Sequence, residues 1–421
     1  MADRAIGTVV EGMARKARAA ADALMDVRQE KINRALLIMA KMLVGEQTRL
    51  KRENARDLAR GRAKGLSGAM LDRLTLSDKA IASMVDGLRT LTRLDSPVGT
   101  AYDRRVRPNG LKIEKRRVPI GVVAIIYESR PNVTVDAGAI CLKSQNAVIL
   151  RGGSEAFHSN MALVKLFGRA LSQAGLPADA IQLIPTTDRA AVDHMLGLSE
   201  LIDLVIPRGG ETLIRAVVEK SRIPVIKHYK GVCHIFVSRH ADMKTALPVV
   251  VNAKVQRPGV CNAMETLLID TKLADAKKRV LIDVLLDKGV VLYGDAGCRR
   301  LSRRVKKASE ADWYAEYLDL RLAVRCVDGV DAAVAHINRY GSRHTDAIVS
   351  ASAKECERFV TRVDSASVMT NTSTRFSDGG EYGMGCEIGI STDKLHARGP
   401  MGVEDLTTYK WVVRGRGQVR S

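Results

Sequence analysis

The sequence is poor in aromatic residues, with only 5 Phe, 9 Tyr and 2 Trp among 421 residues. A protein that binds single-stranded nucleic acid by stacking bases on aromatic side chains needs more of them beside its basic residues. The chain does carry 67 Lys and Arg against 47 Asp and Glu, a net charge of +20 that attracts anions such as phosphates and nucleotides. Because no long segment carries one sign alone, we interpret this surplus mainly as basic residues scattered over solvated surfaces.

Paired cysteines and long apolar segments are also missing. The seven cysteines include no Cys-x-x-Cys pair, which argues against a disulfide framework and a zinc module and favours a reducing compartment. His228, His234 and His240 recur every six residues, a spacing that fits no common metal site. No apolar run approaches the ~18 residues of a membrane span, and the N-terminus lacks a secretory pattern. We therefore expect a cytoplasmic protein with no metal and no membrane partner.

The N-terminal quarter has the apolar periodicity of helices. Apolar residues recur at helical spacing around residues 32–43 and again around 71–88, and Ser77 is the expected N-cap of the second helix. Residues 102–118 instead predict a β-hairpin, because a Pro-Asn-Gly turn at 108–110 precedes the alternating stretch Leu111–Val118. A basic hairpin of this kind has little core of its own, so we expect it to pair with another subunit.

Two successive α/β series follow the hairpin. Short apolar strands alternate with amphipathic helices, which predicts parallel sheets with helices on both faces and two lobes. The strands expected in the first series are 121–127, 147–150, 181–184 and 204–206, with a helix at 159–174. The strands expected in the second are 235–237, 266–269, 290–292, 322–327 and 347–349, with helices at 242–253, 274–287 and 329–338. A last strand is expected at 408–413.

Two glycine turns with an arginine follow strands of the first series. They are Arg151-Gly152-Gly and Arg208-Gly209-Gly210, and the second of them also opens a helix. Glycine lets the backbone approach a ligand closely, and the amides of a first helical turn favour an anion. The spacing is not that of a dinucleotide fingerprint, so a structural turn and a phosphate site remain alternatives.

One cysteine stands apart from the other six. Cys261 follows a Pro-Gly turn between a predicted helix and a predicted strand, and Arg257 and Lys254 lie close enough in sequence to stabilise its thiolate. The other cysteines lie in apolar or helical stretches typical of small core residues. Cys261 is therefore the candidate nucleophile, with an incidental loop cysteine as the alternative.

Together these motifs resemble the glutamate-5-semialdehyde dehydrogenase family, also called γ-glutamyl phosphate reductases, within the aldehyde dehydrogenase superfamily. The resemblance spans essentially the whole chain and is carried by residues 118–134, 151–155, 207–210, 261–263, 371–385 and 395–402. It implies an α/β fold like that of aldehyde dehydrogenases, with two lobes and a β-hairpin oligomerisation arm. The implied domains are cofactor-binding (1–101 and 119–232), arm (102–118 and 400–421) and catalytic (233–399).

The resemblance also implies a reaction, the NADPH-dependent reduction of γ-glutamyl phosphate to glutamate 5-semialdehyde with release of phosphate, in proline biosynthesis. Cys261 would form a thioester with the acyl group. The Cys261 amide with Ser129 or Asn132 would bind the oxyanion, and Arg257 or Arg130 the leaving phosphate. The segment His228–Gly231, where oxidising relatives carry a glutamate that activates water, contains no carboxylate here. That absence suits a reductase, which must not hydrolyse its thioester.

The remaining site residues are likewise implied by the resemblance. Arg151 would lie at the adenosine ribose and favour NADPH, although Glu155 nearby opposes a second phosphate. Glu316 would bind the nicotinamide ribose. The substrate's α-carboxylate would be held by Arg375 and Arg130. The full set expected around substrate and cofactor is Ser129, Arg130, Asn132, Arg257, Asn262, Ser373 and Arg375, and Arg151, Gly152, Arg208, Gly209, Gly210 and Glu316.

Two other functions remain open at this level. One is a different thiol-dependent acyl-group reductase of the same superfamily, for example one that takes acyl-CoA. The other is a basic nucleic-acid-binding protein, which the scarcity of aromatic residues disfavours. The expected partners are a small-molecule substrate, further copies of the chain in a dimer or tetramer, and, transiently, glutamate 5-kinase, with no nucleic acid.

Overall fold

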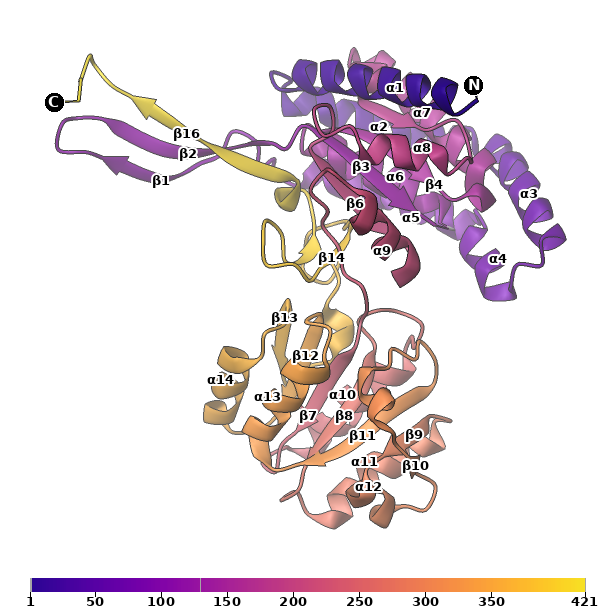
Figure 1. Cartoon of the computed structure of the whole chain (residues 1–421), viewed down its shortest axis with the longest axis vertical. Coiled ribbons are helices and arrows are strands. Elements are labelled where there is room, and N and C mark those ends of the chain that lie inside the picture. Colours follow the sequence, from indigo (N-terminus) through magenta and orange to yellow (C-terminus); the bar gives the residue numbers. More distant parts are fainter. Residues whose placement is uncertain (1, 129, 421) are drawn as a thin grey trace. The chain divides into compact units, whose positions relative to one another are not determined.

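The computed structural model describes residues 2–128 and 130–420, which divide into two compact units. The first unit comprises residues 1–227, 383–389 and 401–421, and the second comprises 228–382 and 390–400 (Figure 1). The sequence places the division at 232/233 and assigns 383–389 to the second lobe, whereas the compact units divide after 227 and place 383–389 with the first unit. Within the described residues, no helix is both long and apolar enough to cross a bilayer.

Helices open the first unit, as the periodicity predicts. They are α1 (Ala2–Leu24), α2 (Gln29–Gly45), α3 (Gln47–Ala63), α4 (Gly68–Leu74) and α5 (Asp78–Arg93). In α2 the apolar residues Ile32, Leu36 and Leu43 are completely buried, which explains why this stretch folds as a helix against the rest of the unit. Ser77 caps α5 by accepting a hydrogen bond from the Ala80 N–H, which confirms the predicted N-cap.

A four-stranded parallel sheet forms the centre of the first unit. Its order is β5-β4-β3-β6, with β3 (Val122–Tyr127), β4 (Ala147–Gly152), β5 (Ile181–Leu183) and β6 (Leu204–Arg208). Every residue of β3 is buried, so the strand is apolar along its whole length. The helices between and after the strands are α6 (Pro131–Lys143), α7 (Phe157–Ala174), α8 (Ala190–Leu196) and α9 (Glu211–Lys220). The four predicted strands and the helix ending before Gly175 are confirmed.

The second unit is built on a seven-stranded sheet with the order β10-β9-β11-β8-β7-β12-β13. The strands are β7 (Cys233–Val237), β8 (Met264–Asp270), β9 (Val291–Gly294), β10 (Lys306–Lys307), β11 (Arg321–Val327), β12 (Thr345–Val349) and β13 (Ser367–Thr370). The helices are α10 (Met243–Val255), α11 (Asp275–Asp287), α12 (Ala296–Leu301), α13 (Gly329–Tyr340) and α14 (Ala353–Arg362). All five predicted strands are present and parallel to their neighbours.

Two strands of this sheet, β10 and β13, were not predicted from the sequence. β10 has only two residues, both exposed lysines, and β13 alternates burial over four residues that include serine and threonine. Neither carries the apolar run that marks an interior strand of a parallel sheet. Both lie at the edges of the sheet, where one side of the strand needs no partner.

The predicted hairpin is present as β1 (Ala101–Val106) and β2 (Lys112–Pro119), and it gains a third strand. β16 (Thr407–Arg414), the predicted final strand, pairs antiparallel with β2, so that Trp411 lies opposite Lys115. We call these three strands the arm. Figure 1 shows the arm as a ribbon separate from the four-stranded sheet of its unit. The short strands β14 (Gly389–Ser391) and β15 (Gly399–Met401) form a further pair.

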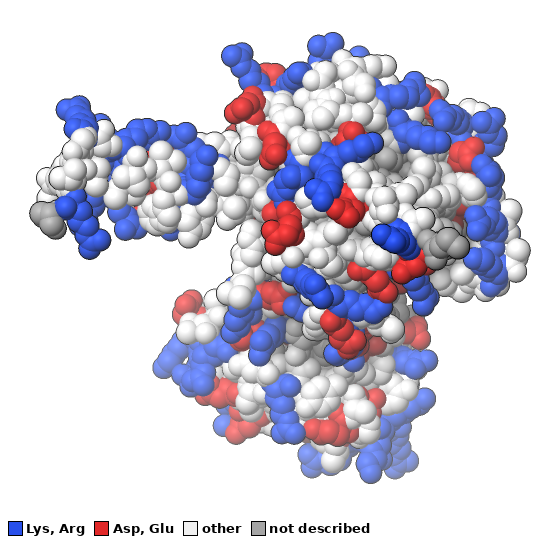
Figure 2. Space-filling model, turned by 45° about the horizontal axis from the view of Figure 1, so that its top comes forward, with Lys and Arg blue, Asp and Glu red and all other residues white. Residues whose placement is uncertain are grey.

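The arm exposes aromatic side chains beneath basic ones. Tyr409 is 46% and Trp411 49% exposed, and the Lys115 ammonium lies 4.6 Å and 4.9 Å from their ring centroids. Figure 2 shows Lys and Arg side chains along the arm. In such cation–π contacts the aliphatic part of the lysine side chain covers part of each ring, while the ammonium group stays in contact with water.

Candidate functional site

Cys261 lies in the second unit, on the loop between α10 and β8, as predicted. Its thiol is not bonded to another cysteine, and the residue is half-buried. A turn in which the Ala263 N–H donates to the Val260 carbonyl closes the loop around it. The helix ends and the strand begins within a few residues of Cys261, so both fix its position.

The backbone of Gly231 lies directly against that of Cys261. A Cβ atom at position 231 would come within 2.0 Å of the Cys261 carbonyl oxygen and 2.5 Å of its Cα, a separation that no side chain tolerates. The Gly231 N–H in turn donates to Oε1 of Glu316 at 2.8 Å. Glu316, predicted as a ribose ligand, therefore also anchors the segment that contacts Cys261.

Two histidines surround the thiol. A ring nitrogen of His228, a ring nitrogen of His344 and the Cys261 Sγ all lie within 4.8 Å of one another. The two rings meet edge to face with centroids 5.6 Å apart. His344 is buried and its Nδ1 lies 2.9 Å from Oγ1 of Thr345, whereas His228 is half-buried. A thiol with two imidazoles can transfer a proton, and the same three atoms have the ligand types of a zinc site.

Sequence reasoning missed both histidines. His228 and His344 are far apart along the chain, and each precedes a different strand of the sheet. One signal was available: the segment 228–231 lacks the carboxylate of oxidising relatives and carries His228, which the six-residue spacing with His234 and His240 had excluded only as a metal ligand. β7 and β12 are parallel neighbours, so the residues that precede these two strands lie at the same edge of the sheet. This arrangement brings His228 and His344 together.

The predicted polar residues of the second unit gather around Asn262. The Arg375 Nε donates to Oε1 of Gln256 at 2.8 Å and its Nη1 donates to Oδ1 of Asn262. Asn262 donates onward to the Ser377 carbonyl at 2.9 Å, and Ser373 Oγ accepts from the Arg375 backbone N–H. The structure thus brings Cys261, Asn262, Ser373 and Arg375 into one cluster.

A second cation reinforces this cluster electrostatically. Burial lowers the pKa of the Arg375 guanidinium, and the neighbouring charge of Arg257 lowers it further, while Asp378 and Cys261 oppose the shift. Two guanidinium groups that repel one another at a half-buried site favour the binding of an anion between them. The exposed Arg257 and the half-buried Arg375 thus both contribute positive charge on the side of the second unit that carries Cys261.

Lys254 does not have the role that its sequence position suggests. Its ammonium is completely buried and lies 2.7 Å from the equally buried carboxylate of Glu265, so it is committed to that partner rather than to Cys261. Burial lowers the pKa of Lys254, and burial raises that of Glu265 to about 7 against the opposing charge of Lys254. Oε1 of Glu265 also accepts the Leu318 N–H, which supports the loop that carries Glu316.

In the first unit, Arg151 extends from the end of β4. Its Nη1 donates to the Gly152 carbonyl and its Nη2 to the Thr187 carbonyl, each at 3.0 Å. Its Nε is buried without a hydrogen-bond partner among the described residues, and burial lowers the pKa of the group. An unsatisfied buried donor at the carboxyl end of a parallel strand fits a ligand site.

The turn after β6 already holds an anion of the protein itself. The Gly210 N–H, at the start of α9, donates to Oε2 of Glu128 at 3.0 Å, and a Cβ at Gly209 would come within 2.4 Å of the same oxygen. Arg208 turns elsewhere, since its guanidinium occupies the space where a Cβ of Gly389 would lie. The anion predicted here would have to displace the Glu128 carboxylate or bind beside it.

The remaining predicted residues surround the start of α6. Arg130 is the exposed residue before the helix, and Asn132 donates through Nδ2 to Asp136 at 3.0 Å. Burial raises the pKa of Asp136 to about 6, partly offset by the hydrogen bond from Asn132. Ser129 lies outside the described residues.

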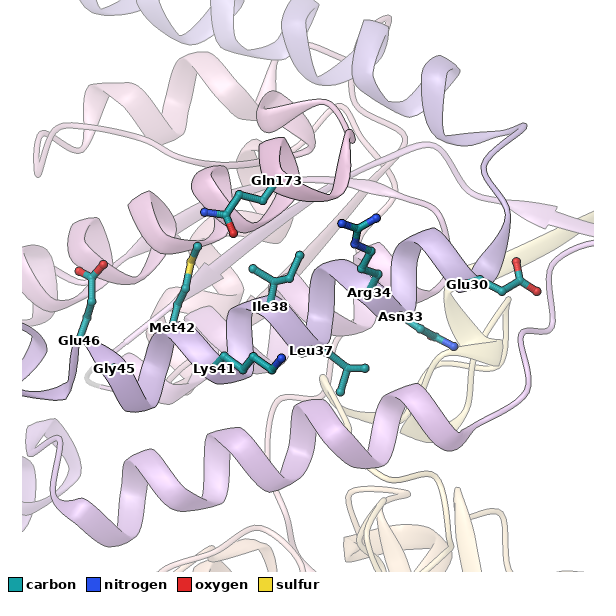
Figure 3. Close-up of a pocket in the computed structure, with 10 residues that line it drawn as sticks. All are labelled: Glu30, Asn33, Arg34, Leu37, Ile38, Lys41, Met42, Gly45, Glu46 and Gln173. Atoms are coloured by element: carbon teal, nitrogen blue, oxygen red, sulfur yellow. The ribbon is translucent and has the colours of Figure 1, made fainter.

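A separate hollow of about 1110 Å³ follows α2. Figure 3 shows Ile38, Met42 and Arg34 along one side of that helix, with Gln173 reaching towards them from α7. None of the predicted site residues is among the ten that line it.

Comparison with known proteins identifies the family. Residues 3–286 match the aldehyde dehydrogenase family. A γ-glutamyl phosphate reductase from Geobacter metallireducens is 53% identical over 415 residues, which cover 99% of each chain. The chain belongs to the γ-glutamyl phosphate reductase family. A crystal structure of the family member from Thermotoga maritima is 43% identical, has a TM-score of 0.96 and covers 98% of this chain and 100% of its own.

Membership in the γ-glutamyl phosphate reductase family confirms the resemblance and the predicted aldehyde-dehydrogenase-like fold, and it makes the chain an oxidoreductase. An engineered glycolyl-CoA reductase solved with bound NADP+ shares the fold at 15% identity, with a TM-score of 0.68 over 96% of each chain. The family assignment favours the enzyme over the nucleic-acid-binding alternative.

Proposed function

We propose that this chain reduces γ-glutamyl phosphate to glutamate 5-semialdehyde and releases phosphate, in the synthesis of proline from glutamate. The observation that carries the proposal is the cluster of the Cys261 thiol with the imidazoles of His228 and His344, in the same unit as two cations, Arg375 and Arg257, that act on each other. Reduction of an acyl phosphate through a thioester needs a nucleophile and a base that takes the proton of that nucleophile. It also needs cations for the two anionic ends of the substrate, and these residues supply each group.

The nucleophile is Cys261. His228 takes the thiol proton, and the thiolate attacks the γ-acyl carbon. A C–S bond forms, the C–O bond to phosphorus breaks, and phosphate leaves with Arg257 beside it. After hydride transfer the hemithioacetal collapses, which breaks the C–S bond, releases the aldehyde and returns the thiolate to Cys261. His228 suits the proton transfer better than His344, because it is half-buried and can exchange its proton with water.

The far end of the substrate carries an α-carboxylate. Arg375 is the residue proposed to bind it, since Gln256 and Asn262 hold the guanidinium in a fixed orientation. A planar guanidinium held in this way can pair with a carboxylate through two parallel hydrogen bonds. Arg130, in the first unit, is the second candidate for the carboxylate or for the phosphate.

A nicotinamide cofactor, NADPH by preference, is proposed to bind the first unit. When bound it supplies the hydride. The unsatisfied Nε of Arg151 fits a phosphate at the adenosine ribose. Gly152 beside it is packed against Asn160, which leaves no room for a side chain at position 152. Glu316 remains the proposed contact for the nicotinamide ribose. Glu155 opposes the preference for NADPH, since its charge acts on Arg151.

The partners and location are proposed on the same basis. Self-association through the arm would cover Tyr409 and Trp411, two adjacent aromatic side chains that are about half exposed. A labile acyl phosphate favours transient contact with the kinase that makes it, and such a pathway belongs in the cytoplasm.

The test is the reaction run in reverse. The protein with glutamate 5-semialdehyde and NADP+ should form NADPH only when phosphate is added, and coenzyme A should not replace phosphate. Cys261→Ser should keep less than about a hundredth of the turnover, as expected when a covalent nucleophile is removed. The matched control is Cys141→Ser, a fully buried cysteine whose loss should leave turnover near that of the unmodified chain. Turnover that needs coenzyme A, or that survives without Cys261, would overturn the proposal.

A further inference from the structure

A second pair of cysteines lies in the second unit. The Sγ atoms of Cys298 and Cys326 are 3.5 Å apart and not bonded to each other. Cys298 is fully buried in α12, and Cys326 is half-buried in the neighbouring strand β11. The sequence predicts all cysteines other than Cys261 as small core residues, but Cys326, like Cys356 and Cys386, is only half-buried.

The backbone holds the two thiols together. The carboxylate of Asp295 accepts the Cys298 N–H through Oδ1 at 2.9 Å and the Cys326 N–H through Oδ2 at 3.1 Å. One side chain therefore clamps both cysteines. A Cβ at Gly297 would come within 3.2 Å of the Cys326 Sγ, so the glycine leaves the space into which that sulfur packs.

The environment distinguishes the two thiols. The hydrogen bond from Cys298 lowers the pKa of Cys326, and the charges of Lys278 and Arg300 act in the same direction. The same hydrogen bond raises the pKa of Cys298, and burial raises it further. Burial and the charge of Asp295 oppose the lowering at Cys326. Cys326 is thus the more acidic and the less buried thiol of the pair, and Cys298 is its less acidic, buried neighbour.

A metal ion fits this cluster less well than oxidation does. Asp295 is the third potential ligand, but both of its oxygens already accept backbone hydrogen bonds, and withdrawing one would leave a buried N–H unsatisfied. Two sulfurs alone do not complete the four-ligand shell of a structural zinc site.

We propose that Cys326 and Cys298 form a peroxide-oxidised disulfide pair, in which Cys326 reacts and Cys298 resolves. The Cys326 thiolate attacks a hydroperoxide, the O–O bond breaks, and the sulfur is oxidised to a sulfenic acid while the peroxide is reduced to an alcohol or water. Cys298 then attacks that sulfur, an S–S bond forms, and the sulfenic hydroxyl leaves with the Cys298 proton as water. The two sulfurs are now 3.5 Å apart and would have to move together to the roughly 2.05 Å of an S–S bond.

The experiment uses the full chain carrying Cys261→Ser, so that the proposed nucleophile does not compete for the oxidant. After exposure to hydrogen peroxide, remaining thiols are blocked with N-ethylmaleimide and the protein is digested with trypsin without reduction. Cleavage after Lys and Arg separates the two cysteines into peptides 289–299 and 326–339. The expected product is these two peptides joined, with two hydrogens fewer than their sum.

Single variants assign the roles. In Cys298→Ser the oxidised Cys326 cannot be resolved, so dimedone should label it as a sulfenic acid. In Cys326→Ser the buried Cys298 should stay reduced. Cys356 is the internal comparison, because it is half-buried like Cys326 but burial and Glu355 raise its pKa. Cys326 should react roughly tenfold faster than Cys356 or more.

Three outcomes would overturn the proposal. They are oxidation of Cys356 as fast as that of Cys326, disulfides that join other cysteines or other chains instead, and stoichiometric Zn²⁺ binding that is lost in both single variants. The last would make the cluster a metal site. Because none of these readouts needs turnover, the result is independent of the reaction proposed above.

Discussion

Gly231 and Cys261 touch backbone to backbone, and the contact leaves no room for a side chain at position 231. The segment that contains His228 and the loop that contains the thiol are thereby fixed against each other. Glu316 completes the arrangement from a third part of the chain, through the Gly231 N–H. The position of the thiol thus depends on three segments that are separate in sequence.

Gly231→Ala is expected to displace Cys261, because the new methyl group would overlap its carbonyl. A displacement of this size at a reacting atom costs roughly a hundredfold in kcat/KM. The matched control is Gly259→Ala, two residues before the thiol, where the nearest atom to a new Cβ would be the Leu318 carbonyl oxygen at 3.7 Å. Both variants are compared by kcat/KM and by thermal unfolding. Equal activity in the two would show that the contact does not position the thiol.

His228→Gln is expected to remove the base that takes the Cys261 proton. Loss of a positioned base costs about a hundredfold or more in rate. Alkylation of Cys261 by iodoacetamide, followed by mass spectrometry, measures the thiolate directly and should slow in the same variant. His240→Gln, at an exposed histidine, serves as the control and should change neither value. Unchanged alkylation in His228→Gln would assign the proton transfer to another group.

Arg375→Lys is expected to lose much of kcat/KM for the natural substrate, since lysine keeps the charge but not the planar fork. It also loses the two hydrogen bonds that hold the guanidinium to Gln256 and Asn262. Oxidation of propionaldehyde, which has no α-carboxylate, provides the comparison and should be almost unaffected wherever it is measurable. An equal loss with both aldehydes would indicate that Arg375 supports the loop rather than the substrate.

Arg151→Ala is expected to raise the apparent KM for NADPH much more than that for NADH. The physical reason is that a guanidinium pairs with a 2′-phosphate, whereas a ribose hydroxyl offers only a neutral partner. Steady-state kinetics with both cofactors give the ratio. A parallel rise for the two would show that Arg151 supports the turn through its bonds to Gly152 and Thr187 and does not read the phosphate.

The arm is expected to join copies of the chain. Replacing Trp411 and Val413 with glutamate would put charge on two side chains that are 49% and 55% exposed, and should shift sedimentation at micromolar protein towards smaller species. Val9→Glu alters an apolar residue of α1 that is 49% exposed and should leave the assembly intact. A monomer in the unmodified chain would contradict the role of the arm.

Much of the molecule follows from patterns that are local in sequence. Periodicity and turn residues were sufficient to predict features that depend only on neighbours within one element. Examples are the alternation in Leu111–Val118, the buried run 122–127 and the glycine after α7. The loop position of Cys261 is local in the same sense, because a helix ends and a strand begins beside it. The motifs spread along the whole chain were enough to identify the family.

Contacts between distant segments were decided by the tertiary structure alone. Periodicity does not give the order of strands in a sheet, and that order puts β12 beside β7 and so brings His344 to His228 and Cys261. The same limit hid the pairing of β16 with β2 and the meeting of Cys298 with Cys326. Lys254 is a further case. Its position in the sequence suggests that it stabilises the Cys261 thiolate, but in the structure its ammonium is buried against Glu265. The sequence therefore determined which elements form, and only their packing determined which side chains share a site.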